Sequence, residues 1–282
     1  MNSISSVKKK FQKKIHTIFT ISETSSLWRK WVLKEILNKS LLESILHEND
    51  IISSVDHQKI NLLINHLLSY QPVQYFFGYS YFRNLKFNVN ESVLIPRPET
   101  EQLVDIVIQE SEKSNPVNII DIGTGSGCIA ISIHKLIKSK IIAIDISEKS
   151  LFKAKENACI HKANINFMLI DILNINHHHL LPKIDFIVSN PPYVTYMEVP
   201  KKSIIHSEPK DAIFVSDDNP LIFYEYILKF AKSNLNISGK IFFEINPKFL
   251  SELLIIIKKY GFSNIKILND FYEKKRFIIV YS

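Results

Sequence analysis

Cysteine is scarce in this chain of 282 residues. The two present, Cys128 and Cys159, form neither the closely spaced set typical of a disulfide framework nor a set of metal ligands. We expect Cys128 to pack as a small apolar residue at the start of a helix. Three histidines, 177–179, have no carboxylate or cysteine beside them in sequence. We therefore predict a loop there in preference to a metal site, and no metal elsewhere.

Long apolar runs are also missing. No segment approaches the roughly 18 apolar residues that a membrane-spanning helix requires. The first 14 residues carry the positive charges of a signal peptide, but no apolar segment follows them. We expect a cytoplasmic protein without membrane contact.

Acidic residues are outnumbered by basic ones, 28 to 35, which gives a net charge of +7. This balance permits a nucleic-acid or ribosome-associated partner. The abundance of Lys, Asn and Ile favours a simpler explanation, the coding bias of an AT-rich genome. Lys8, Lys9, Lys10, Lys13 and Lys14 fit a solvated helix face as well as a binding patch.

The order of sequence patterns divides the chain into three parts. Residues 1–72 have apolar residues at helical spacing, for example Ile60, Leu63 and Ile64, with Ser53 placed to cap a helix; they predict a small helical bundle. Residues 73–95 are rich in aromatic and β-branched residues around turn signals, which predicts a β-hairpin linker. Residues 96–282 form the third part, which opens with a helix over residues 99–111.

Strands and helices alternate in the third part, which predicts an α/β doubly wound, mostly parallel seven-stranded sheet. The last two strands are separated by only a short polar loop and should form an antiparallel hairpin at the sheet edge. We expect helices at 129–137, 151–161 and 221–234. Strands are expected at 118–122, 140–144, 165–169, 186–188, 240–244, 264–268 and 277–281.

A glycine-rich turn follows the first strand of this sheet. Its glycines allow a tight turn and a close approach of the backbone to a ligand. The spacing Gly-x-Gly-x-Gly differs from the dinucleotide fingerprint, and the Lys-Ser/Thr of a phosphate loop is missing, so a nucleoside without phosphates fits better. The predicted ligand-binding residues here are Gly123, Thr124, Gly125, Ser126 and Gly127.

Acidic residues follow the next two strands. Asp145 is placed to bind both hydroxyls of a ribose, and its charge disfavours a 2′-phosphate. Asp171 can meet an adenine edge or an amino group, with Ile172 packed on the ring. A structural capping role for Asp171 is the alternative.

The sequence Asn190-Pro191-Pro192-Tyr193 follows the apolar residues 186–188. Two prolines remove two backbone donors and stiffen the turn. The side-chain carbonyl of Asn190 and the backbone carbonyl of Pro191 can both accept hydrogen bonds from one planar NH2 group, while Tyr193 provides an aromatic wall. An ordinary Pro-Pro turn is the alternative if the motif is read alone.

Together, the glycine turn, the acid after the second strand and the Asn-Pro-Pro-Tyr turn resemble the class I S-adenosylmethionine-dependent methyltransferases. All three fall at the carboxyl ends of strands, where such sheets bind ligands. The resemblance implies S-adenosylmethionine as the cofactor, contacted by the turn glycines, Asp145, Asp171, Ile172 and Asn190.

Further segments resemble the HemK-type glutamine methyltransferases, which modify the glutamine of the Gly-Gly-Gln motif in class-1 peptide-chain release factors. These segments are Pro72-Val73-Gln74-Tyr75, residues 94–101, Glu208-Pro209 and Phe243-Glu244-Ile245. The resemblance covers nearly the whole chain and implies a cytoplasmic monomer that acts in translation termination. Its N-terminal domain would dock the release factor.

The resemblance also implies roles for the turn. Asn190, Pro191 and Tyr193 would be catalytic, and Pro192 would join them in binding the substrate amide. No strong general base is expected. The chain departs from the family at Asn246-Pro247-Lys248, where many members have Gly and then Gln, and at Ile172, where an aromatic residue is common.

Two other functions compete with this interpretation. A nucleic-acid adenine-N6 or guanine-N2 methyltransferase would share the Asn-Pro-Pro-Tyr turn and suit the basic charge, but no target-recognition domain follows the catalytic part. A cofactor-binding adaptor without activity is disfavoured by the intact turn.

Overall fold

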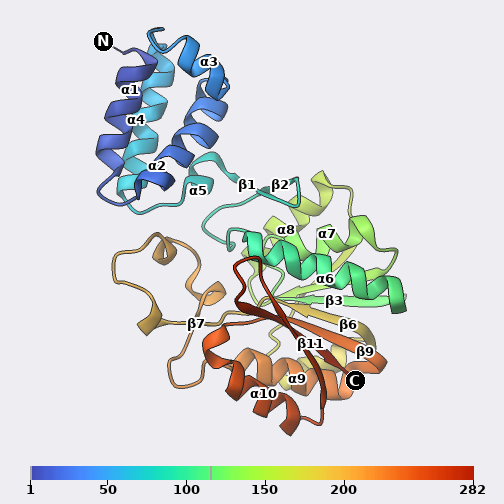
Figure 1. The fold of residues 1–282 in the computed structure, drawn as a ribbon. Helices are drawn as coiled ribbons and strands as arrows, with labels where there is room; N and C mark the ends of the chain where they lie inside the picture. The colour runs from blue at the N-terminus through green and yellow to red at the C-terminus, as the bar shows by residue number, and fades with distance from the viewer. Residues whose placement is uncertain (1, 115) are drawn as a thin grey trace. The chain divides into compact units, whose positions relative to one another are not determined.

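The computed structural model describes residues 2–114 and 116–282 (Figure 1). The chain divides into two compact units. One comprises Met1–Phe77 and Lys202–Ser207, and the other comprises Gly78–Lys201 and Glu208–Ser282. The predicted domain boundaries, after residue 72 and after residue 95, stay predictions.

The first unit is helical, as expected. Its core is formed by Phe11, Trp28, Val32 and Leu63, which are all buried. Ser53 caps the fourth α-helix by accepting a hydrogen bond from the backbone N–H of Asp56 at 3.1 Å, which confirms the predicted cap. The helices are α1 (Ile4–Ile15), α2 (Ile21–Leu27), the π-helical η1 (Trp28–Ile36), α3 (Leu41–Leu46), α4 (Ser54–Leu68) and α5 (Val73–Phe77).

The predicted hairpin linker is wrong over its first residues. Val73–Phe77 form the helix α5 although they are rich in aromatic residues. Val73, Phe76 and Phe77 pack on the core of the helical unit, so tertiary packing overrides the strand preference of aromatic residues. Gly78, with φ +78°, ends the helix because glycine adopts this left-handed conformation without a Cβ clash.

The hairpin itself follows directly. Strands β1 (Tyr79–Phe82) and β2 (Leu85–Asn88) pair antiparallel. Arg83 and Asn84 between them both have positive φ, +48° and +61°, as a two-residue type I′ turn requires. The backbone N–H of Arg83 donates to Glu101 at 2.9 Å, which ties the turn to the following helix.

The second unit contains the predicted seven-stranded sheet, in the order β10-β11-β9-β6-β3-β4-β5. Strands β9, β6, β3, β4 and β5 are parallel, and β10 and β11 are antiparallel. The edge hairpin is therefore confirmed. The strands are β3 (Asn118–Ile122), β4 (Lys140–Asp145), β5 (Ile165–Leu169), β6 (Ile184–Ser189), β9 (Leu235–Glu244), β10 (Asn264–Asn269) and β11 (Lys275–Tyr281).

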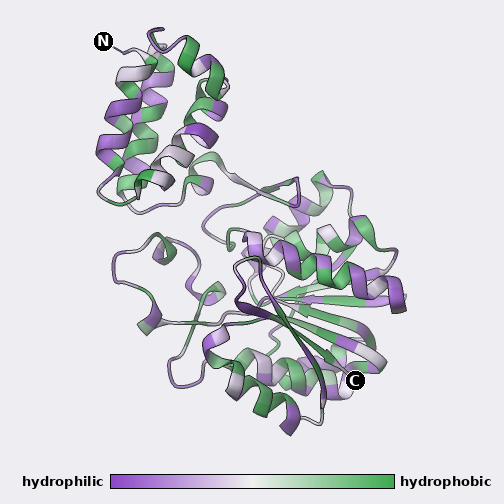
Figure 2. Cartoon of the chain, viewed as in Figure 1, coloured by the Kyte–Doolittle hydropathy of each residue, from purple (hydrophilic) through white to green (hydrophobic). Residues whose placement is uncertain are grey.

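Helices cover both faces of this sheet (Figure 1). One apolar core lies under α6, α7 and α8, and a second lies under α9 and α10. The central strands are hydrophobic along their length (Figure 2), as expected for parallel strands buried on both faces. These helices are α6 (Pro98–Ser114), α7 (Cys128–Leu136), α8 (Glu148–Ile160), α9 (Ile222–Asn234) and α10 (Leu250–Lys259).

A long connection links β6 to α9 and contains a small two-stranded sheet. Its segment Lys202–Ser207 belongs to the helical unit, where the hydroxyl of Ser207 donates to the carbonyl of Tyr70 at 2.8 Å. The short elements of the chain are β7 (Val194–Thr195), β8 (Phe214–Val215), η2 (Ile175–Leu180), η3 (Tyr196–Glu198), η4 (Ile204–Ser207), η5 (Lys210–Ala212) and η6 (Pro247–Phe249).

Among the residues that the structure describes, no helix combines the length and the apolarity needed to cross a membrane.

Candidate active site

The parallel register of the central strands brings the predicted site residues together. Ile122 at the end of β3 pairs with Ile144 on β4 and with Ser189 on β6. The residues that follow these strand ends are the glycine turn, Asp145 and Asn190. All three therefore lie at one edge of the sheet, in agreement with the expected position of ligands in such folds.

The glycine turn is shaped to admit a ligand. Gly123, Gly125 and Gly127 have φ values of +77°, +55° and +81°, which few other residues adopt. A Cβ built on Gly123 or Gly125 would have no atom within 4 Å, so open space lies over both positions. At Gly127 a Cβ would instead lie 3.2 Å from the Cβ of Ala154, and that glycine serves the packing of α7 on α8.

Thr124 and Ser126 are buried within the turn. The Thr124 hydroxyl donates to Asp121 at 2.7 Å, and the Ser126 carbonyl accepts from the side chain of Asn157 at 2.9 Å. Their side chains are thus part of the protein interior, and their predicted contact with a cofactor stays a prediction.

Asp121, at the start of this turn, is a candidate that sequence reasoning missed. It is fully buried, and its Oδ2 accepts from Thr124 at 2.7 Å and from the N–H of Ala130 at 3.2 Å. Its Oδ1 has no hydrogen-bond partner among the described residues. Burial, reinforced by the charge of Asp145, raises the pKa of Asp121 to about 7. A buried oxygen without a donor requires an explanation, and an amino group of a bound ligand would supply one.

Asp145 lies between the glycine turn and the next loop. Its Oδ2 accepts from the N–H of Gly125 and its Oδ1 from the N–H of Ser147, each at 2.9 Å. Each carboxylate oxygen can still accept a further hydrogen bond, as the predicted ribose contact requires. Burial raises the pKa of Asp145, although the two backbone donors favour its charged form.

Asp171 and Ile172 occupy the loop after β5. The Asp171 carboxylate accepts from the N–H of Leu173 at 2.8 Å, which is the structural role kept open as the alternative to an adenine contact. Ile172 is 6% exposed and packs in the core, whereas Ile146, next to Asp145, is 64% exposed. Ile146 is therefore an additional apolar candidate for the pocket, and the adenine contacts of Asp171 and Ile172 remain predictions.

Asn190 is held by a chain of hydrogen bonds from two distant segments. Its side-chain Nδ2 donates to the Oγ1 of Thr100 at 3.0 Å, and Thr100 donates to Oε2 of Glu244 at 2.7 Å. Thr100 lies in the first turn of α6, and Glu244 is the last residue of β9. Both belong to segments that carry the family resemblance, but no local sequence rule pairs residues 144 positions apart.

Tyr193 joins the same carboxylate. Its hydroxyl donates to Oε1 of Glu244 at 2.9 Å. Burial, with the adjacent charge of Glu244, raises the pKa of Tyr193 well above its usual value. The phenol thus stays protonated and cannot act as a base, while its ring packs against the apolar core under α9 and α10.

Asn246, where the chain departs from the family pattern, supports this turn. Its side-chain Nδ2 donates to the backbone carbonyl of Tyr193 at 3.2 Å and to the carboxylate of Glu198 at 3.1 Å. The departure therefore keeps a polar contact to the Asn-Pro-Pro-Tyr turn.

A partly buried ion pair joins two more of the segments that resemble the family. Arg97 contacts Oε1 of Glu208 at 2.5 Å, and Oε2 of the same carboxylate accepts from the N–H of Ile95 at 3.1 Å. This pair fixes the segment before α6, and thereby the position of Thr100, relative to the loop after β7.

Burial raises the pKa of the Cys128 thiol to about 12, and its packing at the start of α7 is as predicted. No group of three His, Cys, Asp or Glu side chains within residues 2–114 and 116–282 could hold a metal ion.

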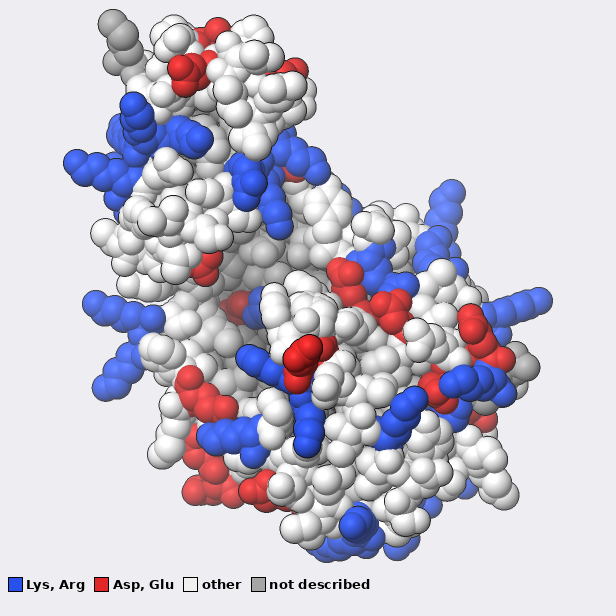
Figure 3. All heavy atoms as spheres, in the orientation of Figure 1, with Lys and Arg blue, Asp and Glu red and all other residues white. Residues whose placement is uncertain are grey.

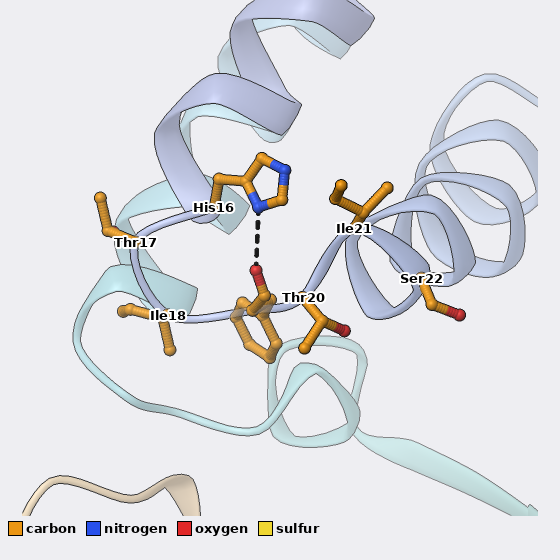
Figure 4. Close-up of a pocket in the computed structure, with 7 residues that line it drawn as sticks. His16, Thr17, Ile18, Thr20, Ile21 and Ser22 are labelled. Atoms are coloured by element: carbon orange, nitrogen blue, oxygen red, sulfur yellow. Dashed lines mark hydrogen bonds between the residues drawn. The ribbon is translucent and has the colours of Figure 1, made fainter.

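A shallow hollow between α1 and α2 is lined by residues 16–22, where His16 Nδ1 lies 3.1 Å from the Phe19 carbonyl oxygen (Figure 4).

Comparison with known proteins agrees with this geometry. A family model described as a methyltransferase domain matches residues 113–237. Among solved structures, a 16S rRNA methyltransferase from T. thermophilus superposes with a TM-score of 0.53 over 72% of this chain and 49% of that one, at 13% identity. At this level of identity the match shows the fold, which is that of a class I methyltransferase.

Curated relatives match much more of the sequence. A release factor glutamine methyltransferase from Flavobacterium psychrophilum is 42% identical over 74% of this chain and 75% of its own length. Proteins of the same name from Bacteroides thetaiotaomicron and Lactococcus lactis are 34% and 37% identical, over 86% and 92% of this chain and 88% and 93% of theirs. The chain therefore belongs to the family of release factor glutamine methyltransferases.

Proposed function

We propose that the protein transfers a methyl group from S-adenosylmethionine to the N5 amide nitrogen of the glutamine in the Gly-Gly-Gln motif of class-1 peptide-chain release factors. The observation that carries the proposal is the orientation of Asn190. Its NH2 group is bound to Thr100, so its carbonyl oxygen is turned the other way and can accept a hydrogen from a substrate.

The residues at the sheet edge fit the cofactor. Open space lies over Gly123 and Gly125, and Asp145 retains acceptor capacity for ribose hydroxyls. Asp121 has a buried oxygen to which no described residue donates a hydrogen bond. When bound, S-adenosylmethionine supplies a methyl group on an electrophilic sulfonium.

The protein must make a weak nucleophile reactive, because the lone pair of an amide nitrogen is delocalised. We assign acceptance of the two amide hydrogens to Oδ1 of Asn190 and to the backbone carbonyl of Pro191. Two fixed acceptors orient the nitrogen and favour its pyramidal form, and orientation can supply a large part of the rate enhancement at such a site. Pro192 and Tyr193 would hold the side chain and exclude water.

No general base is required in this scheme. The N-methylated amide becomes acidic only as the new bond forms, and its proton can then leave to solvent. Tyr193 is excluded as a base by its raised pKa, and the carboxylate of Glu244 is buried and occupied by Thr100 and Tyr193.

We assign docking of the release factor to the helical unit. Leu42 and Leu46 lie four residues apart on one face of α3 and are 65% and 70% exposed, and α3 is visibly hydrophobic in Figure 2. Exposed apolar groups on one face indicate a protein contact. Lys and Arg side chains also lie on this unit (Figure 3) and would attract acidic partner surfaces.

The rest of the proposal follows from the substrate. Release factors act on ribosomes, so the reaction takes place in the cytoplasm. One copy of the chain carries every residue named above, so we expect a monomer to be active.

The test is methylation of each class-1 release factor by purified protein with isotope-labelled cofactor, followed by peptide mass analysis. One added methyl group on the Gly-Gly-Gln glutamine is expected, and a factor with that glutamine changed to alanine is the control. Methylation of added RNA or DNA instead would favour the nucleic-acid alternative and contradict the proposal.

A further inference from the structure

We propose that Thr100 and Glu244 are positioning residues which fix the direction of the Asn190 amide. This inference rests on the proposed function, because it explains how the carbonyl end of that amide is kept toward the substrate. The direction is set by which group donates and which accepts in the hydrogen bonds that join Glu244, Thr100 and Asn190.

The carboxylate of Glu244 sets the polarity at one end. An ionised carboxylate has no proton and can only accept hydrogen bonds. It accepts from Thr100 at Oε2 and from Tyr193 at Oε1. Burial raises the pKa of Glu244, but both hydroxyl donors and the charge of Arg276 oppose this shift, as an acceptor in this position requires.

Thr100 transmits the polarity to Asn190. A hydroxyl carries one proton, and that of Thr100 is donated to Glu244 at 2.7 Å. The oxygen of Thr100 can therefore only accept from its other neighbour, Asn190, at 3.0 Å. An amide group that points its NH2 at Thr100 must point its oxygen away from it.

Without the hydrogen bonds from Glu244 through Thr100, the side-chain amide of Asn190 would have little reason to prefer one direction, because its oxygen and nitrogen are nearly equal in size. The reversed amide would present NH2 to the NH2 of the substrate glutamine, and two donors cannot bond to each other. The chain therefore selects the reactive orientation before the substrate binds.

Thr100 is 3% exposed and Glu244 is 1% exposed, so neither side chain needs to touch the substrate. Tyr224 offers a matched control. It is equally buried, but its hydroxyl donates to the backbone carbonyl of Glu244 at 2.8 Å and leaves the carboxylate untouched. Loss of the Tyr224 hydroxyl removes a buried hydrogen bond but does not change the donor–acceptor direction between Glu244, Thr100 and Asn190.

The experiment compares Thr100→Val, Thr100→Ser, Glu244→Gln and Tyr224→Phe in methyl transfer to a full-length release factor. Valine has the shape of threonine without the hydroxyl. Glutamine at position 244 adds an NH2 donor, which can reverse the donor–acceptor direction of the hydrogen bonds through Thr100 to Asn190. We expect Thr100→Val and Glu244→Gln to lower kcat about tenfold or more, the value of one hydrogen bond. Cofactor affinity should stay unchanged, and Thr100→Ser and Tyr224→Phe should keep kcat within about threefold of the wild type.

A second readout does not depend on activity. In NMR spectra of isotope-labelled protein, one side-chain NH2 proton of Asn190 should be protected from exchange with solvent. This protection should be lost in Thr100→Val and kept in Tyr224→Phe. Wild-type kcat in Thr100→Val, or equal impairment in Thr100→Ser and Thr100→Val, would overturn the inference. A wild-type protein with the protected resonance but without methylation of any release factor would instead refute the proposed function alone.

Discussion

Asp121 combines complete burial with an oxygen that accepts no hydrogen bond from any residue that the structure describes. Its carboxyl group has a pKa of about 7 in the folded protein, above the ordinary 3.8. The folded state therefore holds the proton more tightly than the unfolded state. Its contribution to stability is complete below about pH 4 and is lost as the pH rises through about 7. A ligand that donates a hydrogen bond to Oδ1 of Asp121 would offset this loss of stability at higher pH.

The first prediction concerns Asp121→Asn, which removes the charge and keeps the shape. The wild type should lose stability relative to this variant between about pH 4 and about pH 7, by a difference on the order of a few kcal/mol. Thermal unfolding of both proteins across this range measures the difference. A constant difference in melting temperature across this range would contradict the assigned pKa.

The second prediction concerns Asp145→Ala, which removes the acceptor assigned to the ribose. Cofactor affinity should fall about tenfold or more, since charge-assisted hydrogen bonds are lost. Titration calorimetry measures the affinity. Glu148→Ala is the control, because Glu148 is an exposed acid three residues further on. Equal affinities for both variants would reject the ribose assignment.

Several residues of the site could be predicted from the sequence because each sits at the end of a recognisable strand. Gly123, Asp145 and Asn190 were chosen in this way, and the structure places them at the same edge of the sheet, while their roles stay predictions. Thr100 and Glu244 could not be given a role, since a hydrogen bond between residues far apart in sequence depends on the packing of α6 against β9. Asp121 was passed over because sequence shows neither its burial nor its missing donor.

At the scale of elements, Gly127 shows that one turn serves two purposes. Its backbone is left-handed, and a Cβ would lie 3.1 Å from Ile131 and 3.2 Å from Ala154. The turn thus combines the proposed ligand site with the packing of α7 on α8. Gly261, after α10, has φ +91° but open space around its Cβ position.

The third prediction compares Gly127→Ala with Gly261→Ala. Both should lose about 1–2 kcal/mol from the left-handed backbone. Gly127→Ala should lose about 1–3 kcal/mol more because of overpacking, and it should also weaken cofactor binding. Chemical denaturation measures both free energies of unfolding. Equal losses would show that the contact with Ala154 relaxes freely.

The strands of the sheet were predicted closely because buried parallel strands are continuous runs of β-branched residues. Strand β3 and strand β5 match their predicted bounds. Strand β9 begins at Leu235, before the predicted residue 240, and runs through Gly239. The helix α5 was missed because its aromatic residues pack on the helical unit.

At the scale of the molecule, the division into two units separates docking from chemistry in the proposed function. The residues assigned to the cofactor and to the amide all lie in the second unit, and the exposed leucines of α3 lie in the first. The membership of Lys202–Ser207 in the first unit could not be seen in the sequence, because it depends on contacts made across a long connection.

The fourth prediction follows from this separation. The double variant Leu42→Ser, Leu46→Ser should raise KM for the release factor about fivefold or more, while kcat at saturation and cofactor affinity stay unchanged. Ile237→Ser, which changes an exposed apolar residue of the second unit, is the control. An unchanged KM in the double variant would exclude this face of α3 as the docking surface.

The most direct measurement of the central claim uses Asn190→Ala. The rate of methyl transfer to the Gly-Gly-Gln glutamine and the cofactor affinity are measured on the same preparation. Asn236→Ala serves as the control, since the Asn236 side chain donates to Asp185 near the start of β9. We predict that Asn190→Ala lowers kcat about a hundredfold or more while the cofactor still binds. Full activity of Asn190→Ala would contradict the account.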